Sequence, residues 1–427
     1  MTSTPTASPV VTAVLTGLQQ ARGWLEDFYR DLHEHPELSH QEARTAARVA
    51  DRLRQAGYEV HEGIGGTGVV AILHNGSEPT VLMRADMDAL PVREDTGLDY
   101  ASAATADVSG QQVPVMHACG HDVHVTCLTG AAYLLAQAAD QWAGTVVALF
   151  QPAEETGDGA RAMVQDHLTD VIPSPTVALA QHVLAFPAGQ VGTRPGPVLS
   201  AADSLKITIH GRGAHGSMPQ AAVDPVVIAS AVVLRLQTIV SRELRPGDPA
   251  VVTVGSVQAG TKSNVIPDTA TLLVNIRTYS ESTRTRVLDA ITRIVTAECA
   301  AAASPTPPVL EPYEHYPLTA NDPDVTAQVA AAFSTHFGER AITLPLQSAS
   351  EDFSDIPAAL GTPYTYWGIG GADPDAYAAA QRAGRVDQDI PVNHSAGFAP
   401  VIQPTLDTGT QALAVAALAW LSDNRDG

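Results

Sequence analysis

Residues 125–152, VTCLTGAAYLLAQAADQWAGTVVALFQP, carry the clearest fold signal in the chain. Residues 125–140 are small and apolar on every side, as in a helix that is buried all round. Residues 144–152 are a short apolar run bounded by glycine and proline, which predicts a buried strand. A helix that leads directly into a buried strand is typical of an α/β fold.

The same two patterns recur on both sides of this stretch. Further apolar runs, each bounded by turn or polar residues, predict buried strands at 68–76, 80–87 and 176–183. Apolar residues recur at helical spacing over 11–57, with a break at Pro36, and this predicts two helices. The alternation predicts a mixed, mostly parallel sheet that is flanked by helices.

The order of elements changes after a Pro/Gly-rich stretch at 193–203. From there the patterns predict strand, helix, strand, strand, helix and strand, with Pro225 in the first turn of one helix and a serine cap on the other. This βαββαβ order is that of the ferredoxin-like arrangement. We therefore expect a discontinuous catalytic domain, residues 10–199 and 314–427, with a second domain, residues 200–313, inserted into it.

Composition narrows the function classes. Asp and Glu total 46 against 24 Lys and Arg, a net charge of −22, which disfavours nucleic acid and anionic membranes as partners. No stretch approaches the roughly 20 apolar residues that span a bilayer. Only three cysteines, Cys119, Cys127 and Cys299, are widely spaced, so they favour a reducing cytoplasm and leave a thiolate available to a metal ion.

The segment HACGHDVH (117–124) places one of these cysteines among histidines. Cys119 and His121 flank Gly120, where a turn can aim both at one divalent ion. For a lone cysteine or histidine, a turn with a buried thiol is the better interpretation. Five such side chains immediately before a buried helix favour a metal site instead.

Carboxylates and histidines follow the predicted strands, where α/β sheets place their sites. QPAEE (151–155) supplies Glu154 and Glu155, which point in different directions, so one can bind metal while the other faces an activated water. An acidic solvated loop is the alternative. The other candidates are His182 at a strand end, His394 near the C-terminus, and Asp86 and Asp88 in RADMDALP (84–91).

Eight motifs in order resemble the aminoacylase and carboxypeptidase superfamily of dinuclear zinc peptidases. The branch they resemble most is that of hippurate hydrolases, indoleacetyl-amino-acid hydrolases and N-acyl-amino-acid aminoacylases, over about residues 20 to 420. The motifs are RADMDALP, HACGHD, QPAEE, the strand-end His182, GRGAHGSMP (211–219), SNVIPDTATLLVNIR (263–277), SEDF (350–353) and NHSAGFAP (393–400).

The resemblance implies a role for each matching residue. The metal ligands would be Cys119, His121, Glu155, His182 and His394, with the Cys119 thiolate bridging two divalent ions. Glu154 would be the general base, and Asp88 would support the ligands. Asp86 stands where the wider superfamily has a ligand histidine. The donor set favours zinc, with manganese or cobalt as alternatives.

The inserted domain resembles the superfamily's lid and dimerisation domain. This implies a homodimer, in which His215 donates a hydrogen bond to the oxyanion, in relatives often in the partner's catalytic centre. Asn264 and Arg277 match a clamp on the substrate's free carboxylate. On the residues alone, His215 is equally a turn residue and Arg277 an ordinary solvent-facing strand residue.

The sequence thus predicts a metal-dependent amidohydrolase that cleaves an N-acyl amino acid into a carboxylic acid and a free amino acid. A dipeptidase or carboxypeptidase of the same superfamily is the first alternative. A non-catalytic binding protein with the same fold is the second.

Overall fold

A computed structural model of the protein describes residues 8–421, which divide into two compact units. Within the described residues, the first unit holds 8–198, 320–346 and 352–421. The second unit holds 199–319 together with the short segment 347–351. The sequence did not predict that this segment belongs to the second unit.

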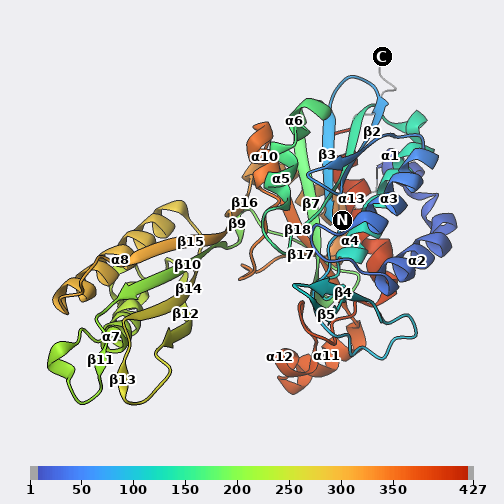
Figure 1. The fold of residues 1–427 in the computed structure, drawn as a ribbon. Coiled ribbons are helices and arrows are strands. Elements are labelled where there is room, and N and C mark those ends of the chain that lie inside the picture. The colour runs from blue at the N-terminus through green and yellow to red at the C-terminus, as the bar shows by residue number, and fades with distance from the viewer. Residues whose placement is uncertain (1–7, 422–427) are drawn as a thin grey trace. The chain divides into compact units, whose positions relative to one another are not determined.

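The first unit is built on an eight-stranded mixed sheet, ordered β1-β2-β6-β3-β7-β18-β8-β17 (Figure 1). Its centre is parallel: β3 lies between β6 and β7, and β18 continues on the far side of β7, all in the same direction. The edges contain antiparallel pairs. The strands are β1 (Glu59–Ile64), β2 (Gly68–Asn75), β3 (Thr80–Asp86), β6 (Gly144–Gln151), β7 (Val177–Pro187), β8 (Val191–Thr193), β17 (Ala341–Thr343) and β18 (Tyr364–Ala372).

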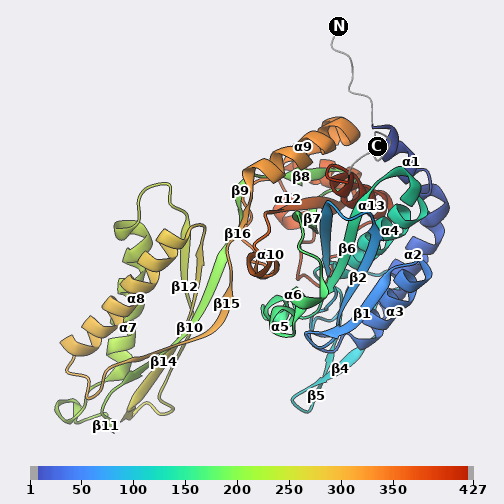
Figure 2. The same ribbon diagram turned by 90° about the horizontal axis from the view of Figure 1, so that it is seen from above.

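Helices cover both faces of this sheet, as the sequence predicted. Both views show α2, α3 and α4 on one side and the short α5, α6 and α10 on the other (Figures 1 and 2). The helices of the unit are α1 (Pro9–Leu15), α2 (Leu18–Glu34), α3 (Ala43–Gln55), α4 (His121–Gln137), α5 (Gly159–Gln165), α6 (Leu168–Val171), α9 (Pro323–Phe337), α10 (Asp355–Leu360), α11 (Pro374–Ala383), α12 (Val386–Asp389) and α13 (Ile402–Leu418).

The core of this unit follows from the continuous apolar runs. Every residue of β3 and β6 is buried, as expected for strands with a neighbour on each edge and packing on both faces. Helix α4 is also buried almost all round and packs against α13 and α2. It begins at His121, several residues before the predicted start, so two histidines of the HACGHDVH segment lie in its first turn.

The second unit has the βαββαβ order expected for residues 200–313. Its antiparallel sheet is ordered β12-β14-β10-β15. The elements are β10 (Ala201–His210), β11 (Ala214–His215), α7 (Pro225–Thr238), β12 (Ala250–Ala259), β13 (Val265–Ile266), β14 (Thr269–Thr278), α8 (Glu281–Ala301) and β15 (Val309–Tyr316). Asp224 caps α7 ahead of Pro225, and Ser280 caps α8 through the backbone N–H of Thr283.

Smaller elements went unpredicted. A hairpin of β4 (Thr105–Val108) and β5 (Gln111–Pro114) lies in the loop between β3 and α4, and β9 (Gly196–Leu199) pairs with β16 (Thr319–Asn321). Single-turn helices are η1 (Ala139–Gln141), η2 (Pro219–Ala221), η3 (Ile239–Glu243) and η4 (Gly338–Arg340). These segments are short and carry weak hydrophobic patterns, so a period of 2 or 3.6 cannot reveal them.

The expectation that no stretch is long and apolar enough to span a bilayer was wrong for one helical stretch. Residues Pro225–Glu243, comprising α7 and η3, form a 19-residue helical stretch that is apolar and long enough to cross a membrane by composition alone. One face of this stretch packs on β14 and β12 in the core of the second unit. A single helix of this kind is weak evidence for a membrane span.

Candidate metal centre

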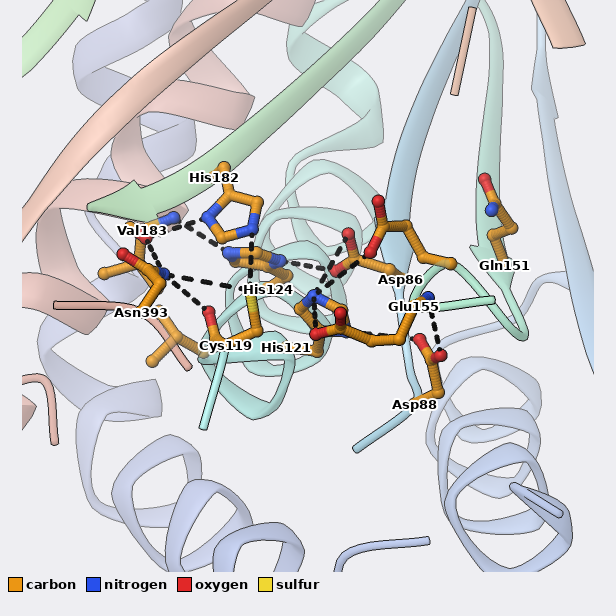
Figure 3. A network of polar contacts seen from close by, with 12 residues as sticks. Asp86, Asp88, Cys119, His121, His124, Gln151, Glu155, His182, Val183 and Asn393 are labelled. Carbon is orange, nitrogen blue, oxygen red and sulfur yellow. Dashed lines mark hydrogen bonds and ion pairs between the residues drawn. The ribbon is translucent and has the colours of Figure 1, made fainter. Parts of the chain in front are cut away.

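The predicted ligands converge at the carboxyl ends of three parallel strands. Asp86 ends β3, Glu154 and Glu155 follow β6, and His182 lies in β7 just beyond its pairing with β3. The loop into α4 brings Cys119 and His121 to the same edge (Figure 3). This is the edge where open α/β sheets place their sites, because the connecting loops leave the strands there.

The ligand atoms form two overlapping groups. Those of Cys119, Glu155 and His394 lie within 4.8 Å of one another, and so do those of His121, Glu154 and Glu155. His394 Nε2 is 3.4 Å from Glu155 Oε2, and Cys119 Sγ is 3.4 Å from His182 Nε2. All five predicted metal ligands and Glu154 therefore meet in one place.

Hydrogen bonds set the ring orientations of two of the predicted ligand histidines. His121 Nδ1 lies 3.2 Å from Asp88 Oδ1, which leaves Nε2 buried and without a hydrogen-bond partner. His182 Nδ1 donates to the carbonyl oxygen of Val183 over 2.8 Å, so its Nε2 carries the lone pair that points towards Cys119. Each ring thus presents Nε2 to the centre, as a histidine ligand does when its other nitrogen is hydrogen-bonded.

Asp88 contacts two of the predicted metal ligands and is not in the metal-ligand groups described above. Its Oδ2 accepts hydrogen bonds from Ser39 Oγ at 2.7 Å and from the backbone N–H of Glu155 at 2.9 Å. With its other oxygen on His121, Asp88 connects two of the predicted ligands. This arrangement supports the role that the sequence assigned to it, which is to hold the ligands.

The buried charges and the pKa shifts at the centre favour a bound cation. Burial raises the pKa of the Cys119 thiol well above its ordinary value, and Glu155, Glu154 and Asp86 raise it further. Burial alone would lower the pKa of His121, but Asp86, Asp88 and Glu155 outweigh it and raise that pKa to about 10. Buried acidic groups in this number need positive charge, which protons or metal ions supply.

The residues present fit a divalent metal. Burial, and the repulsion of nearby His124, lower the pKa of His182 well below its usual value, so its ring is neutral and free to coordinate. Thiolate, imidazole and carboxylate are the donors that zinc takes, and manganese and cobalt accept the same oxygen and nitrogen donors. The buried Nε2 of His121, which makes no hydrogen bond, is the donor that most clearly fits such an ion.

Asp86, which stands where the wider superfamily has a ligand histidine, is hydrogen-bonded to two buried neighbours. It is fully buried, and its two oxygens contact Arg84 Nη1 at 2.7 Å and His124 Nδ1 at 2.5 Å. Burial raises the pKa of Asp86, but His121, His124 and Arg84 outweigh burial and hold it well below the usual range. Asp86 is therefore an ionised carboxylate whose oxygens are already engaged.

Two polar residues that the sequence reasoning did not single out support the centre. His124, on the first turn of α4, contacts Asp86 and the backbone of Val183. Asn393 Nδ2 donates to the carbonyl oxygens of Cys119 and Val183, both at 3.1 Å (Figure 3). In the sequence, only their position next to predicted ligands could have pointed to them: His124 ends the HACGHDVH segment, and Asn393 precedes His394.

In the second unit, His215 and Asn264 lie together. His215 in β11 pairs with Val265 in β13, and the backbone N–H of Gly216 donates to the carbonyl oxygen of Asn264 at 2.8 Å. Both side chains belong to exposed residues. The two strands form a small ribbon of their own, separate from the main sheet of the unit.

Arg277 lies at the other end of the same unit. It is paired with Ala202 at the start of β10, whereas Thr269, close to Asn264, is paired with His210 at the end of β10. Eight residues of extended strand separate Thr269 from Arg277, a distance of about 26 Å. Arg277 donates to Ser350 Oγ at 2.7 Å and to Asn275 Oδ1 at 3.0 Å. Asn264, five residues before Thr269, therefore lies towards the end of the second unit that is remote from Arg277.

Comparisons with known proteins identify the family to which the chain belongs. The model of peptidase family M20/M25/M40 matches residues 82–392. The chain is 38% identical over 337 residues to hippurate hydrolase of Campylobacter jejuni, which covers 78% of this chain and 84% of the relative. It is 37% identical over 358 residues to thermostable carboxypeptidase 1 of Saccharolobus solfataricus, covering 83% and 87%.

A solved structure of a dinuclear metal-binding peptidase shares the fold. It is an M20-family protein from Bacillus subtilis, with a TM-score of 0.75 and 27% sequence identity. The match covers 93% of this chain and 98% of that structure.

Proposed function

The chain belongs to peptidase family M20/M25/M40, and we propose that it is a metal-dependent amidohydrolase that cleaves N-acyl amino acids to a carboxylic acid and a free amino acid. The observation that carries the proposal is the meeting of Cys119, His121, Glu155, His182 and His394 around one point, with Glu154 beside them. The relative named hippurate hydrolase supports a substrate in which an acyl group is linked to an amino acid.

The centre would hold two divalent ions, with zinc favoured and manganese or cobalt as alternatives. The ions would be bound by Cys119, His121, Glu155, His182 and His394, and Cys119 would be the shared ligand. Bound there, they would supply a Lewis acid for the amide carbonyl and lower the pKa of water.

Glu154 is the general base in this proposal. Its side chain is largely buried beside the centre, and its Oε2 lies 3.9 Å from His121 Nε2. Glu155 is the adjacent residue, so one carboxylate is directed to the ions while the other faces the attacking water. Glu154 would take the proton from that water and then deliver it to the leaving amine.

His215 and Asn264 would act on the substrate bound to a second copy of the chain. Their shared position at one end of the second unit, far from Arg277, supports this arrangement. His215 would donate a hydrogen bond to the oxyanion, while Asn264 from one chain and Arg277 from the other hold the substrate carboxylate. The second unit would then be the lid and dimerisation domain.

Exposed apolar side chains on α7 and β12 of the second unit support a homodimer. On α7, Val227 is 65% exposed and Leu234 is 73% exposed. The neighbouring β12 is an edge strand that carries exposed Val251 and Val257. Exposed apolar side chains beside an unpaired strand edge are suited to a second copy of the same surface. The three cysteines, all buried and free, support the cytoplasmic location inferred from the sequence.

A carboxypeptidase or dipeptidase activity is the second candidate, because the relative from Saccharolobus solfataricus is named a carboxypeptidase. The two activities differ in the group on the acyl side of the scissile bond, which carries a free amine only in a dipeptide. A panel of acetyl-, benzoyl-, long-chain acyl- and indoleacetyl-amino acids, measured beside dipeptides, ranks them. Preference for acyl groups without a free amine supports the aminoacylase proposal, and preference for dipeptides contradicts it.

Glu154→Gln, with Glu155→Gln as its matched control, tests the mechanism. The expected result for Glu154→Gln is near-normal metal content with turnover reduced by about 10²- to 10⁴-fold, because only proton transfer is lost. Glu155→Gln should lose metal as well as turnover. Metal is measured by elemental analysis and turnover by release of free amino acid, before and after chelation. Near-normal activity in Glu154→Gln would contradict the proposed mechanism.

A further inference from the structure

Hydrogen bonds hold both backbone groups of Val183, its N–H and its carbonyl oxygen, next to the metal centre. Its backbone N–H donates to His124 Nε2 at 2.8 Å. Its carbonyl oxygen accepts hydrogen bonds from His182 Nδ1 at 2.8 Å and from Asn393 Nδ2 at 3.1 Å (Figure 3). The peptide that links His182 to Val183 is therefore held by His124, and the ring of His182 is held by the next carbonyl along the chain.

The hydrogen bonds define the tautomer of His124. A backbone N–H can only donate, so Nε2 of His124 must be the acceptor with a free lone pair. The proton of the neutral ring is then on Nδ1, which lies 2.5 Å from Asp86 Oδ1. Asp86, an acceptor at both oxygens, selects this tautomer.

Asp86 is itself fixed by a buried polar network. Arg84 donates to Asp86 Oδ2 at 2.7 Å and, through Nε, to Gln151 Oε1 at 2.9 Å. Gln151 Nε2 in turn donates to Asp352 Oδ1 at 2.6 Å. Arg84, Asp86 and His124 are each at most 1% exposed, so bulk solvent does not compete for their hydrogen bonds.

The same geometry excludes His124 as a metal ligand. Asp86, His121, His124 and His182 have ligand atoms within 4.8 Å of one another and resemble a four-residue cation site. Both nitrogens of His124 are engaged by Asp86 and Val183, however, so this ring retains no lone pair for a metal. Only His121 and His182 of the four retain a nitrogen for a metal.

We propose that His124, held in its tautomer by Asp86, is a positioning residue that fixes the backbone at Val183 and thereby aims His182 Nε2 at the metal centre. The rings of His124 and His182 also pack edge to face, with centroids 4.4 Å apart. The inference rests on the proposed metal centre. It gives Asp86, the departure from the superfamily's ligand histidine, a function that requires no contact with the metal.

Three substitutions at residue 124 separate hydrogen bonding from packing. His124→Gln places its amide oxygen near the position of Nε2 and retains the acceptor for Val183. His124→Asn places its amide near Nδ1 and retains only the contact with Asp86. His124→Leu keeps the volume and neither hydrogen bond. The full-length chain is loaded with cobalt(II), and its visible absorption spectrum and its affinity in competition with a chelator are measured.

The expected result is a cobalt affinity about 10- to 100-fold weaker in His124→Asn and His124→Leu, with altered absorption bands, as for the loss of an outer partner of a ligand. His124→Gln should stay within a few-fold of the unchanged chain. Wild-type spectrum and affinity in His124→Leu would overturn the positioning role while leaving the metal centre intact. A wild-type chain that binds neither cobalt nor zinc would overturn the metal centre and the positioning role together.

A second measurement needs only the unchanged chain. Nitrogen NMR of ¹⁵N-histidine-labelled protein, with His124 assigned by its loss in His124→Asn, reports which ring nitrogen carries the proton. A protonated Nδ1 with Nε2 as acceptor is the expected state. A protonated Nε2 would exclude the hydrogen bond from Val183 and overturn the proposal, whatever the stability of the variants.

Discussion

Gly120 lies so close to Val183 that a Cβ at residue 120 would be 2.4 Å from Val183 Cγ1. Gly120 also has a φ of +82°, and it separates the two predicted ligands Cys119 and His121. Glycine at this position thus allows the turn between the two predicted ligands without backbone strain or a clash with Val183.

Gly120→Ala should therefore lose metal as well as stability. Gly57→Ala is the matched control, because Gly57 has a φ of +91° but no atom within 4 Å of the place that a Cβ would take. Both variants carry the strain of a positive φ, about 1–3 kcal/mol. Only Gly120→Ala should also lower metal affinity, by at least about tenfold if the clash costs the centre about 1.4 kcal/mol or more. Equal metal content in the two variants, measured by elemental analysis, would contradict this.

Mixed dimers test whether His215 serves the partner's site. Glu154→Gln and His215→Ala chains, each inactive alone, are co-expressed with different tags, and the doubly tagged dimer is purified. If His215 acts across the dimer, one of its two sites has both residues intact. The purified mixed dimer should then recover about half of wild-type activity, since one of its two sites is complete.

The control for this experiment pairs His215→Ala with Asn264→Ala. Both residues lie at the same end of the second unit, so each site of that mixed dimer receives one substituted residue from its partner, residue 215 at one site and residue 264 at the other. No recovery is expected there. Absence of recovery in the Glu154→Gln and His215→Ala mixture, with dimers present by light scattering, would place His215 in its own chain's site.

Metal binding should release protons. Without metal, His121 has a pKa of about 10 and the Cys119 thiol has a raised pKa, so both carry a proton at pH 8. Coordination requires the neutral imidazole and the thiolate, so about two protons leave and affinity rises with pH. Titration calorimetry in buffers of different ionisation enthalpy measures the number. Cys119→Ser should release about one fewer, and release of none would show that the thiol and imidazole are not ligands.

A buried histidine behind the centre should make stability depend on pH. His33 Nδ1 lies 2.6 Å from Asp122 Oδ2, and Nε2 lies 3.1 Å from Glu94 Oε1. Burial lowers the pKa of His33, but the two carboxylates outweigh it and raise the pKa to about 10. The folded pKa exceeds the unfolded value of about 6.5, so this stabilisation is complete below about pH 6.5 and is lost as the pH rises through about 10.

His33→Gln should accordingly lower the free energy of unfolding by about 3 kcal/mol at about pH 6, and the difference should shrink as the pH rises from about 6.5 towards about 10. Denaturant unfolding of the metal-free chain across this range measures it. The nearby surface variant His35→Gln serves as control, because His35 is half-exposed. A difference that grows with pH would show that His33 is neutral in the folded chain.

The strands that carry the centre were predictable because their signals are local. The runs at 80–87 and 144–152 became β3 and β6, and the residues at their ends became the donors of the centre. Helix α4 began earlier than predicted, because the polar HACGHD segment has the composition of a loop. Its polar side chains are buried in the structure by partners distant in sequence, among them Asp86 and Asp88.

The sequence alone determined which donors are available, their order along the chain and the alternation of strands and helices, because these depend on residue type and short-range periodicity. The tertiary structure decided which nitrogen of His121 and His182 faces the centre and that Asp86 holds His124. It also decided that Arg277 lies near the end of β14 that is remote from Asn264, which precedes the strand. Hydrogen-bond direction and the rise of a ten-residue strand are properties of folded geometry, which no local pattern of residues specifies.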